Sequence, residues 1–303
     1  MNKSPLDIIK EESIKKGFIG IGFTKADAPP FLDNFKTWIK AGKHAGMKWL
    51  ERNSDIRQNP GLLLENCRTI ISLAYPYSWK KPSTPDGFTA ARFTEPQKDD
   101  YHVRLKILAE SLIRKLQPMY PESEWRICID SAPILERSFA YKAGIGFIGK
   151  NNMLIIPGYG SFLYLAEILT TASLPVANSI PIKHQCGECS LCLDACPNGA
   201  LEGPFRLNSE RCLSYVTIES KEDVSPAIGA MMGECFFGCD ICQEACPHNR
   251  KVDEREISLP SSEDILQMGK GEFKKYFRNT SFSRSGLKKI KSNLNAVKKI
   301  LFD

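Results

Sequence analysis

Hydrophobic and polar positions alternate with two different periods over roughly the first 180 residues. Apolar residues at helical spacing from Val103 to Leu116 predict one amphipathic helix. A second helix is predicted in "SPLDIIKEESIKKG", which starts with Ser-Pro and stops at glycine. Short apolar runs predict strands in "FIGIGFT", "CRTIISLAYPY" and "RICIDSAP", the last running into a turn. The alternation predicts an α/β or α+β domain.

A glycine-rich segment follows, in "AYKAGIGFIGKNNMLIIPGYGSFLYLAEILT", and predicts a helix, a loop and then a strand. Within it, "GIGFIG" fits the G-x-G-x-x-G spacing but follows a helix where a dinucleotide site needs a strand. "IGFIGKNN" lacks the spacing of a phosphate-binding loop. General motifs therefore name no flavin or nicotinamide cofactor.

The totals place these segments in one large domain with a smaller one beside it, because 303 residues that are 42% hydrophobic can bury a sizeable core. The net charge of +6 permits an anionic partner without requiring one. The chain has no apolar run of about eighteen residues, no twin arginine and no signal-peptide core, which predicts a cytoplasmic protein. In that reducing compartment, the 11 cysteines are better metal ligands than disulfide partners.

Nine of the cysteines lie between positions 186 and 246, whereas Cys67 and Cys128 sit in apolar strand-like runs and are interpreted as buried packing thiols. The first set follows the bacterial ferredoxin pattern C-x2-C-x2-C-x3-C-P, in which the fourth cysteine binds the other cluster of a pair. The second set keeps C-x2-C-x3-C-P, with its first ligand displaced upstream to Cys212.

The crossed ferredoxin pattern predicts two 4Fe–4S clusters. One would be bound by Cys186, Cys189, Cys192 and Cys246, and the other by Cys196, Cys212, Cys239 and Cys242. Cys235 is left over and could replace Cys239 or Cys212. A pair of zinc knuckles is the alternative, but zinc does not call for a third cysteine three residues on or for both Cys-Pro closures.

The segment "CIDSAPILERSFAYKAGIGFIGKNNMLI", residues 128–155, resembles the epoxyqueuosine reductase family. The resemblance continues through "GSFLYLAEILT", both cysteine sets, "RCLSYVTIE" and "FFGCDICQEACPHN", with weaker similarity in "HAGMKWLERN", "DIRQNP" and "DDYH". It implies a nitroreductase-like α/β cobalamin domain at 1–178, related to that of reductive dehalogenases. A ferredoxin-like double-cluster domain at 179–252 and a basic helical tail at 253–303 would follow.

The resemblance also implies a reaction, the reduction of epoxyqueuosine to queuosine in tRNA. A one-electron donor such as a flavodoxin or ferredoxin would feed the clusters, which reduce cobalamin, and the substrate epoxide would lose its oxygen as water. The proton donor would be Asp130, whose pKa is expected to be raised by an apolar pocket. The alternative for Asp130 is a helix cap before "SAPILER".

Further site residues are proposed around the corrin of the cobalamin. Arg57 would contact its amides or phosphate, and a solvated arginine is the alternative. Tyr215 and Thr217 would lie between the second cluster and the corrin, and Ser161 would approach the ring from a glycine loop. His102 is either a pocket residue or a capping or surface histidine. No histidine lies in D-x-H-x-x-G, so a histidine-ligated cobalamin is not expected.

The end of the chain departs from the resemblance, because the family usually continues into a helical HEAT-type domain that helps hold tRNA. Between 270 and 300 there are ten Lys or Arg and one acid, Glu272. Such a basic helix suits an RNA backbone, and neutralising Lys288, Lys289 and Lys291 would weaken salt-sensitive tRNA binding. A solvated lysine-rich helix is the alternative.

Two other functions remain open at this point. A cytoplasmic cobalamin and iron–sulfur reductase would act on a small molecule, such as a halogenated compound, without binding RNA. A non-catalytic electron carrier would need neither the glycine-lined pocket nor Asp130. The default oligomeric state is a monomer.

Overall fold

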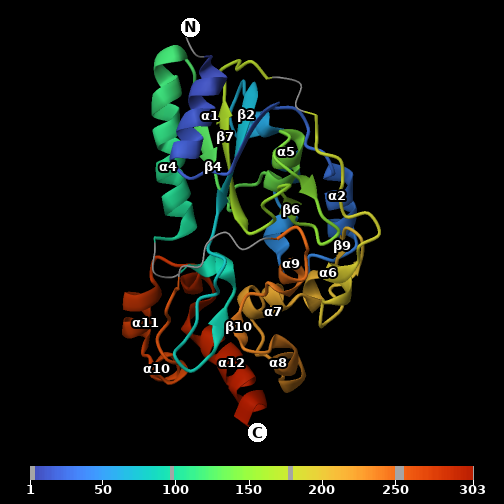
Figure 1. Cartoon of the computed structure of the whole chain (residues 1–303), viewed down its shortest axis with the longest axis vertical. Helices are drawn as coiled ribbons and strands as arrows, with labels where there is room; N and C mark the ends of the chain where they lie inside the picture. The colour runs from blue at the N-terminus through green and yellow to red at the C-terminus, as the bar shows by residue number, and fades with distance from the viewer. Residues whose placement is uncertain (1–3, 96–98, 177–179, 250–255, 303) are drawn as a thin grey trace.

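A four-stranded antiparallel sheet forms the centre of the upper lobe in the computed structural model (Figure 1), which describes residues 4–95, 99–176, 180–249 and 256–302. The strand order is β1-β2-β7-β4. The bounds are β1 Gly20–Lys25, β2 Thr69–Pro76, β4 Trp125–Cys128 and β7 Leu163–Thr170. All three pairings are antiparallel, so β7 is bonded on both sides, by β2 and by β4.

Helices cover both faces of this sheet (Figure 1). On one face lie α1, Pro5–Lys15, and α4, Tyr101–Leu116; on the other lies α5, Glu136–Lys142. The α1 helix begins as predicted, because Ser4 caps it by accepting from the Asp7 amide. The helical spacing of α4 buries one complete stripe: Leu105, Ala109, Leu112 and Leu116. The predicted α/β or α+β class is confirmed, with an all-antiparallel sheet.

Shorter elements surround α5, namely α2 Leu32–Lys40, α3 Ser54–Gln58, β5 Phe147–Ile148 and β6 Leu154–Ile155. The strands β5 and β6 pair within the predicted glycine-rich loop, a hairpin that the pattern did not predict. A Cβ atom on Gly146 would lie 2.4 Å from the carbonyl oxygen of Ile155, so only glycine allows the two segments this approach. The loop is therefore a packed part of the fold.

The lower lobe carries the cysteine runs on two short helices that contact each other, α6 Leu191–Asp194 and α9 Ile241–Glu244. Its other elements are β8 Leu201–Gly203, β9 Arg206–Leu207, α7 Leu213–Ile218, α8 Pro226–Met232 and β10 Cys235–Phe237. A strand from the first half of the chain joins them, because β3, Thr89–Ala90, pairs in parallel with β10. Residues 76–95 therefore pass from the sheet into the lower lobe (Figure 1).

The C-terminal helices pack into this lower lobe (Figure 1). They are α10 Ser262–Gln267, α11 Lys270–Phe277 and α12 Phe282–Phe302, the last broken at Gly286, whose φ is 77°. The apolar side of α12 joins a core with Phe88 of the β3 region and Phe237 of β10. The basic segment is thus amphipathic, and its apolar side belongs to the cluster-binding lobe. The predicted domain boundaries, at 178/179 and 252/253, fall outside the described residues.

Candidate active site and cluster-binding loops

Asp130 lies in the turn that joins β4 to α5, with a φ of 49° that is uncommon for a residue with a side chain. Its Oδ2 accepts a hydrogen bond of 2.9 Å from the Tyr101 hydroxyl. The same oxygen lies 3.4 Å from Nε2 of His102 and 3.8 Å from Nη1 of Arg284. Three elements distant in sequence, α4, the β4–α5 turn and α12, therefore meet at one carboxylate.

The expected protonation of Asp130 needs correction. Burial raises the pKa of Asp130, but the hydrogen bonds from His102 and Tyr101 and the charges of His102 and Arg284 outweigh it and lower that pKa overall. Burial by itself would lower the pKa of His102, yet its bonds to Asp100 and Asp130 raise it to about 9. At neutral pH the proton of this group therefore resides on His102.

His102 lies in the site, whereas the helix-capping alternative for His102 is wrong, because the cap of α4 is Asp100. The side chain of Asp100 caps α4 by accepting from the His102 amide at 2.9 Å. The same carboxylate lies 2.5 Å from His102 Nδ1, so the imidazole is held between Asp100 and Asp130. His102 therefore lies in the first turn of α4 and also in the candidate active site.

The capping alternative for Asp130 is wrong, because α5 begins after Leu135 and has no side-chain cap. Instead, the Asp130 amide donates a 2.6 Å bond to Oε1 of Glu136, in the first turn of α5. Burial, and then the nearby Asp130 charge, raise the pKa of Glu136 to about 8. The turn thus has a second carboxyl that sequence reasoning did not single out.

Arg284 connects the C-terminal helix to this site. Its guanidinium forms an ion pair with Oε1 of Glu219 at 2.6 Å and lies 5.7 Å from the ring centre of Trp49. Nothing in the local sequence distinguishes Arg284 from the other basic residues of the segment, so the sequence offered no signal for this role.

The cysteines of the two runs interact both within and between the predicted ligand sets. Electrostatic interactions link Cys192 with Cys246, Cys186 and Cys189, and link Cys242 with Cys212, Cys196 and also Cys192. Cys239 interacts with Cys212 and Cys242, and also with the left-over Cys235. Within the described ranges no three His, Cys, Asp or Glu side chains are close enough to hold a single metal ion. The ligand set of each cluster therefore remains a prediction.

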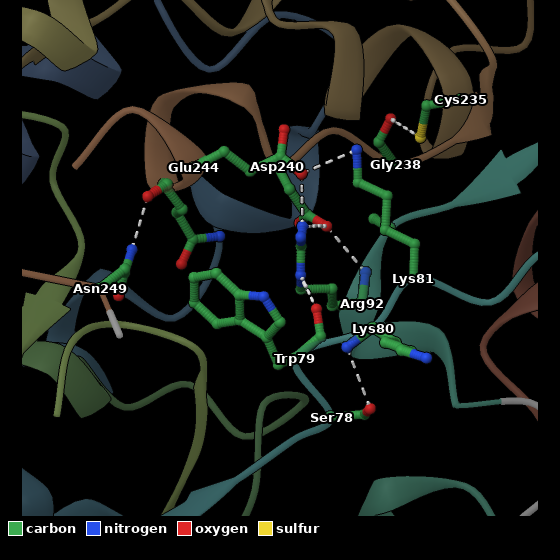
Figure 2. A network of polar contacts seen from close by, with 12 residues as sticks. Ser78, Trp79, Lys80, Lys81, Arg92, Cys235, Gly238, Asp240, Glu244 and Asn249 are labelled. Carbon is green, nitrogen blue, oxygen red and sulfur yellow. Dashed lines mark hydrogen bonds and ion pairs between the residues drawn. The ribbon is translucent and has the colours of Figure 1, made fainter. Parts of the chain in front are cut away.

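A buried ionic network joins Lys81 and Arg92 to Asp240 and Glu244 (Figure 2). Arg92 Nη1 contacts Oδ2 of Asp240 at 3.1 Å and Oε1 of Glu244 at 2.6 Å, and the Arg92 amide donates to Asp240 at 2.9 Å. Lys81 pairs with Glu244 at 2.8 Å. Side-chain exposure is only 9% for Arg92 and 3% for Asp240. The network therefore links residues 76–95, which pass from the sheet into the lower lobe, to the turn that carries Cys239.

Three of the four proposed corrin contacts have other partners. Ser161 is 1% exposed, and its hydroxyl donates to Oε1 of Gln243 at 2.9 Å. Thr217 is completely buried, donates to the Leu213 carbonyl and accepts from the Gly238 amide. The hydroxyl of half-buried Tyr215 accepts from the Gly46 amide at 2.9 Å. A corrin contact by any of them would have to replace or share these bonds.

The fourth proposed contact, Arg57, is 7% exposed and is not the solvated arginine of the alternative. Its guanidinium donates to the carbonyls of Arg52 and Asn53 and lies 5.6 Å from the ring centre of Phe35. These partners, all on the described part of the chain, lie outside the Asp130 turn. The proposed role of Arg57 toward the corrin therefore remains a prediction.

Two families match parts of the chain. Residues 57–131 match the family described as epoxyqueuosine reductase QueG, DUF1730, and residues 185–249 match the 4Fe-4S double cluster binding domain. The second match confirms two iron–sulfur clusters over the zinc alternative. Among the helices that the structure describes, none has both the length and the apolar character needed to span a membrane.

The similarity to individual proteins extends over nearly the whole chain. Epoxyqueuosine reductase from Cellulophaga algicola is 30% identical, with 96% of this chain and 97% of that protein covered. A solved epoxyqueuosine reductase from Streptococcus thermophilus has a TM-score of 0.89 at 29% identity, covering 98% of this chain and 82% of that one. Another, solved with an epoxyqueuosine-modified tRNA stem loop, has a TM-score of 0.83 at 30% identity, covering 96% and 80%.

These matches decide between an enzyme and a non-catalytic carrier, because the relatives are named as reductases over the same length of chain. They cover 96% and 98% of this chain and therefore extend over both lobes. The chain belongs to the epoxyqueuosine reductase family, is an oxidoreductase, and carries a double 4Fe–4S cluster-binding domain.

Proposed function

We propose that this protein reduces epoxyqueuosine to queuosine in tRNA at the Asp130 turn. The observation that carries the proposal is the convergence of Tyr101, His102 and Arg284 on Oδ2 of Asp130 in a chain of this family. A relative solved with an epoxyqueuosine-modified tRNA stem loop supports tRNA as the substrate carrier. An external one-electron donor, such as a flavodoxin or ferredoxin, would supply electrons to a monomer.

The two thiol groups are the proposed ligand sets of the clusters. Their interactions support the crossed assignment, in which Cys246 completes the first cluster and Cys196 the second. Cys192 and Cys242 also interact across the two groups, so the clusters would lie next to each other. Adjacent clusters suit electron transfer through the lower lobe toward the upper one.

The residues around the Asp130 turn fit cobalamin. Asn152 Nδ2 is buried and has no hydrogen-bond partner among the described residues, and Arg137 donates to the Asn152 carbonyl at 2.5 Å. Donors of this kind suit a group that presents amide and phosphate oxygens, and Asn152 and Arg137 would hold it there. Cobalamin, when bound and reduced, supplies a strong nucleophile for opening the epoxide.

The protonation of the site gives Asp130 and His102 complementary roles. The lowered pKa of Asp130 favours its ionised form, and the pKa of His102, about 9, favours a protonated imidazole beside it at neutral pH. His102 would first pass its proton to the Asp130 carboxylate through their contact, and Asp130 would then deliver that proton to the departing epoxide oxygen. Tyr101 and Arg284 would orient the carboxylate while it is ionised.

The proposed tRNA surface differs from the predicted one. Lys289 is 7% exposed and donates to the Glu222 carbonyl at 2.5 Å, and Lys291 donates to the Met268 carbonyl at 2.8 Å. These two lysines fasten α12 and are poor phosphate ligands. The exposed basic side chains of the segment are Lys270, Lys274, Lys275, Arg278, Arg284, Lys288 and Lys299.

The test is anaerobic turnover. The protein is reconstituted with iron, sulfide and cobalamin, reduced, and assayed for conversion of epoxyqueuosine-containing tRNA to queuosine-containing tRNA. Asp130→Asn should lower the rate by on the order of 10²–10⁴-fold, the usual contribution of general acid catalysis, with clusters and cobalamin still bound. The exposed Asp33→Asn is the matched control and should keep the wild-type rate.

Two results would count against the proposal. Wild-type turnover by Asp130→Asn would remove the acid role from Asp130. No conversion by wild-type protein that contains both clusters and cobalamin would overturn the activity itself.

A further inference from the structure

Glu167 is a carboxyl at the centre of the sheet. It lies on β7, is completely buried, and stands directly opposite Ser72 of β2 and Cys128 of β4. Alternation along β7 places it with Leu165 on the face that α5 covers. Neither of its carboxyl oxygens has a hydrogen-bond partner among the described residues.

A buried carboxylate whose oxygens receive no hydrogen bond is unfavourable, so such a group is expected to keep its proton. The neighbour that most affects Glu167 is another carboxyl, Glu136 of α5. Burial first, and then the Glu136 carboxyl, raise the pKa of Glu167, while Ser72 lowers it slightly. Two adjacent carboxyls that cannot both ionise share a proton, as in other carboxyl dyads.

The shared proton would lie directly beneath the reacting turn. Glu136 Oε1 accepts from the Asp130 amide at 2.6 Å, and the Glu136 carboxyl also interacts electrostatically with Glu167, so Glu136 connects the turn to the buried carboxyl. The titratable or charged groups that face the pair come from three elements: His102 of α4, Arg126, Cys128 and Asp130 of β4 and its turn, and Arg137 of α5. On the remaining neighbours the facing residues are Ser72 of β2 and Gly22 of β1.

We propose that Glu136 and Glu167 share a stored proton beneath the Asp130 turn and return it to the Asp130–His102 pair during turnover. The proposal rests on the proposed function. Converting an epoxide to an alkene breaks two C–O bonds, takes two electrons from the external donor through the clusters, and consumes two protons to release one water. His102 and Asp130 hold the first proton, and the buried pair supplies the second.

The first test detects the proton directly and needs no substrate. Infrared spectra at neutral pH should contain the carbonyl stretch of a protonated carboxyl that shifts in D2O. Glu167→Gln, which has nearly the same shape, should remove that band, and Glu136→Gln should remove or shift it. The exposed Glu122→Gln is the control and should leave it unchanged. A band that survives unchanged in both pair variants overturns the proposal.

The second test separates a proton store from a structural role. Glu136→Gln should slow turnover by on the order of 10–100-fold above neutral pH, and by less in acid, where solvent supplies protons readily. A loss that is the same at every pH overturns the relay. The iron–sulfur cluster content and the circular dichroism spectrum of the variant must match those of the wild-type protein. Either Glu136→Gln or Glu167→Gln alone is enough for the comparison. An inactive wild-type protein would instead overturn the proposed function and, with it, the proton relay. The infrared measurement would still test whether Glu136 and Glu167 share a proton.

Discussion

Replacing Arg92 by methionine should destabilise the protein strongly, because it removes the guanidinium from the network of Figure 2 and leaves Asp240 at 3% exposure. Removing one partner of a buried ion pair typically lowers the free energy of unfolding by about 3–5 kcal/mol. Methionine keeps the apolar stem that packs near Phe162, whose ring centre lies 4.7 Å from the guanidinium, so the effect isolates the charge. Glu244 retains Lys81.

The assay is thermal unfolding of the anaerobically reconstituted protein, followed by circular dichroism, with iron content measured in parallel. At about 2 °C per kcal/mol for a chain of this size, the expected fall in apparent Tm is about 6–10 °C. The control is Lys80→Met, which removes an exposed ion pair of 3.0 Å with Glu256 and should change the free energy by less than about 1 kcal/mol.

A double variant distinguishes a broken ion pair from general damage. Arg92→Met with Asp240→Asn removes both charges, and asparagine can still accept from the backbone amide at position 92. The double variant should therefore regain about 1–3 kcal/mol relative to Arg92→Met. The reasoning about the ion pair would be refuted if Arg92→Met were as stable as Lys80→Met. It would also be refuted if the double variant were less stable than Arg92→Met alone.

Three further outcomes are expected. The pKa of His102 is about 9 in the folded state against an ordinary value of about 6.5, so its stabilising contribution is fully present below about pH 6.5 and is lost as pH rises through about 9. Urea unfolding should therefore show that the free energy of unfolding falls by about 1 kcal/mol over that range, a value already reduced for solvent screening. The variant His102→Asn should lack this fall. Replacing exposed Lys274 and Lys288 by glutamine should weaken tRNA binding, as measured by filter binding. The slope of log Kd against log salt should fall by up to about 0.7–0.9 for each phosphate that is no longer neutralised. An unchanged slope would show that neither lysine contacts a phosphate. Cys235→Ser should keep the iron content, whereas Cys239→Ser should lose up to half of it, and equal losses would place Cys235 among the ligands.

Sequence reasoning succeeded where the constraint is local. The helix over α4 followed directly from its period. The hairpin in the glycine-rich loop did not, since each of its strands has only two residues. The crossed assignment of the cysteines also rests on local spacing, and it remains a prediction.

The site itself depends on residues that are distant in sequence. The apolar surroundings of Asp130 suggested a raised pKa, but His102 and Arg284, from α4 and α12, reverse that shift. Lys289 looked like part of a basic surface, yet the helical period turns it toward the lobe's interior. Glu167 stands in an apolar strand, and only the fold brings it to Glu136.

The segment 76–95, which passes from the sheet into the lower lobe, also affects when the protein can fold during its synthesis. The core of the lower lobe contains Phe88, Phe237 and Phe282, so its parts are synthesised at widely separated times. These aromatic side chains can meet only after synthesis has passed Phe282, although the sheet's last strand, β7, ends at Thr170. Because such long-range contacts form slowly, the thiols of Cys239 and Cys242 would stay without their packed surroundings until late in folding. Iron delivery would then follow the synthesis of α12, and a ferredoxin-like module could not be exchanged between relatives by cutting the gene at one point.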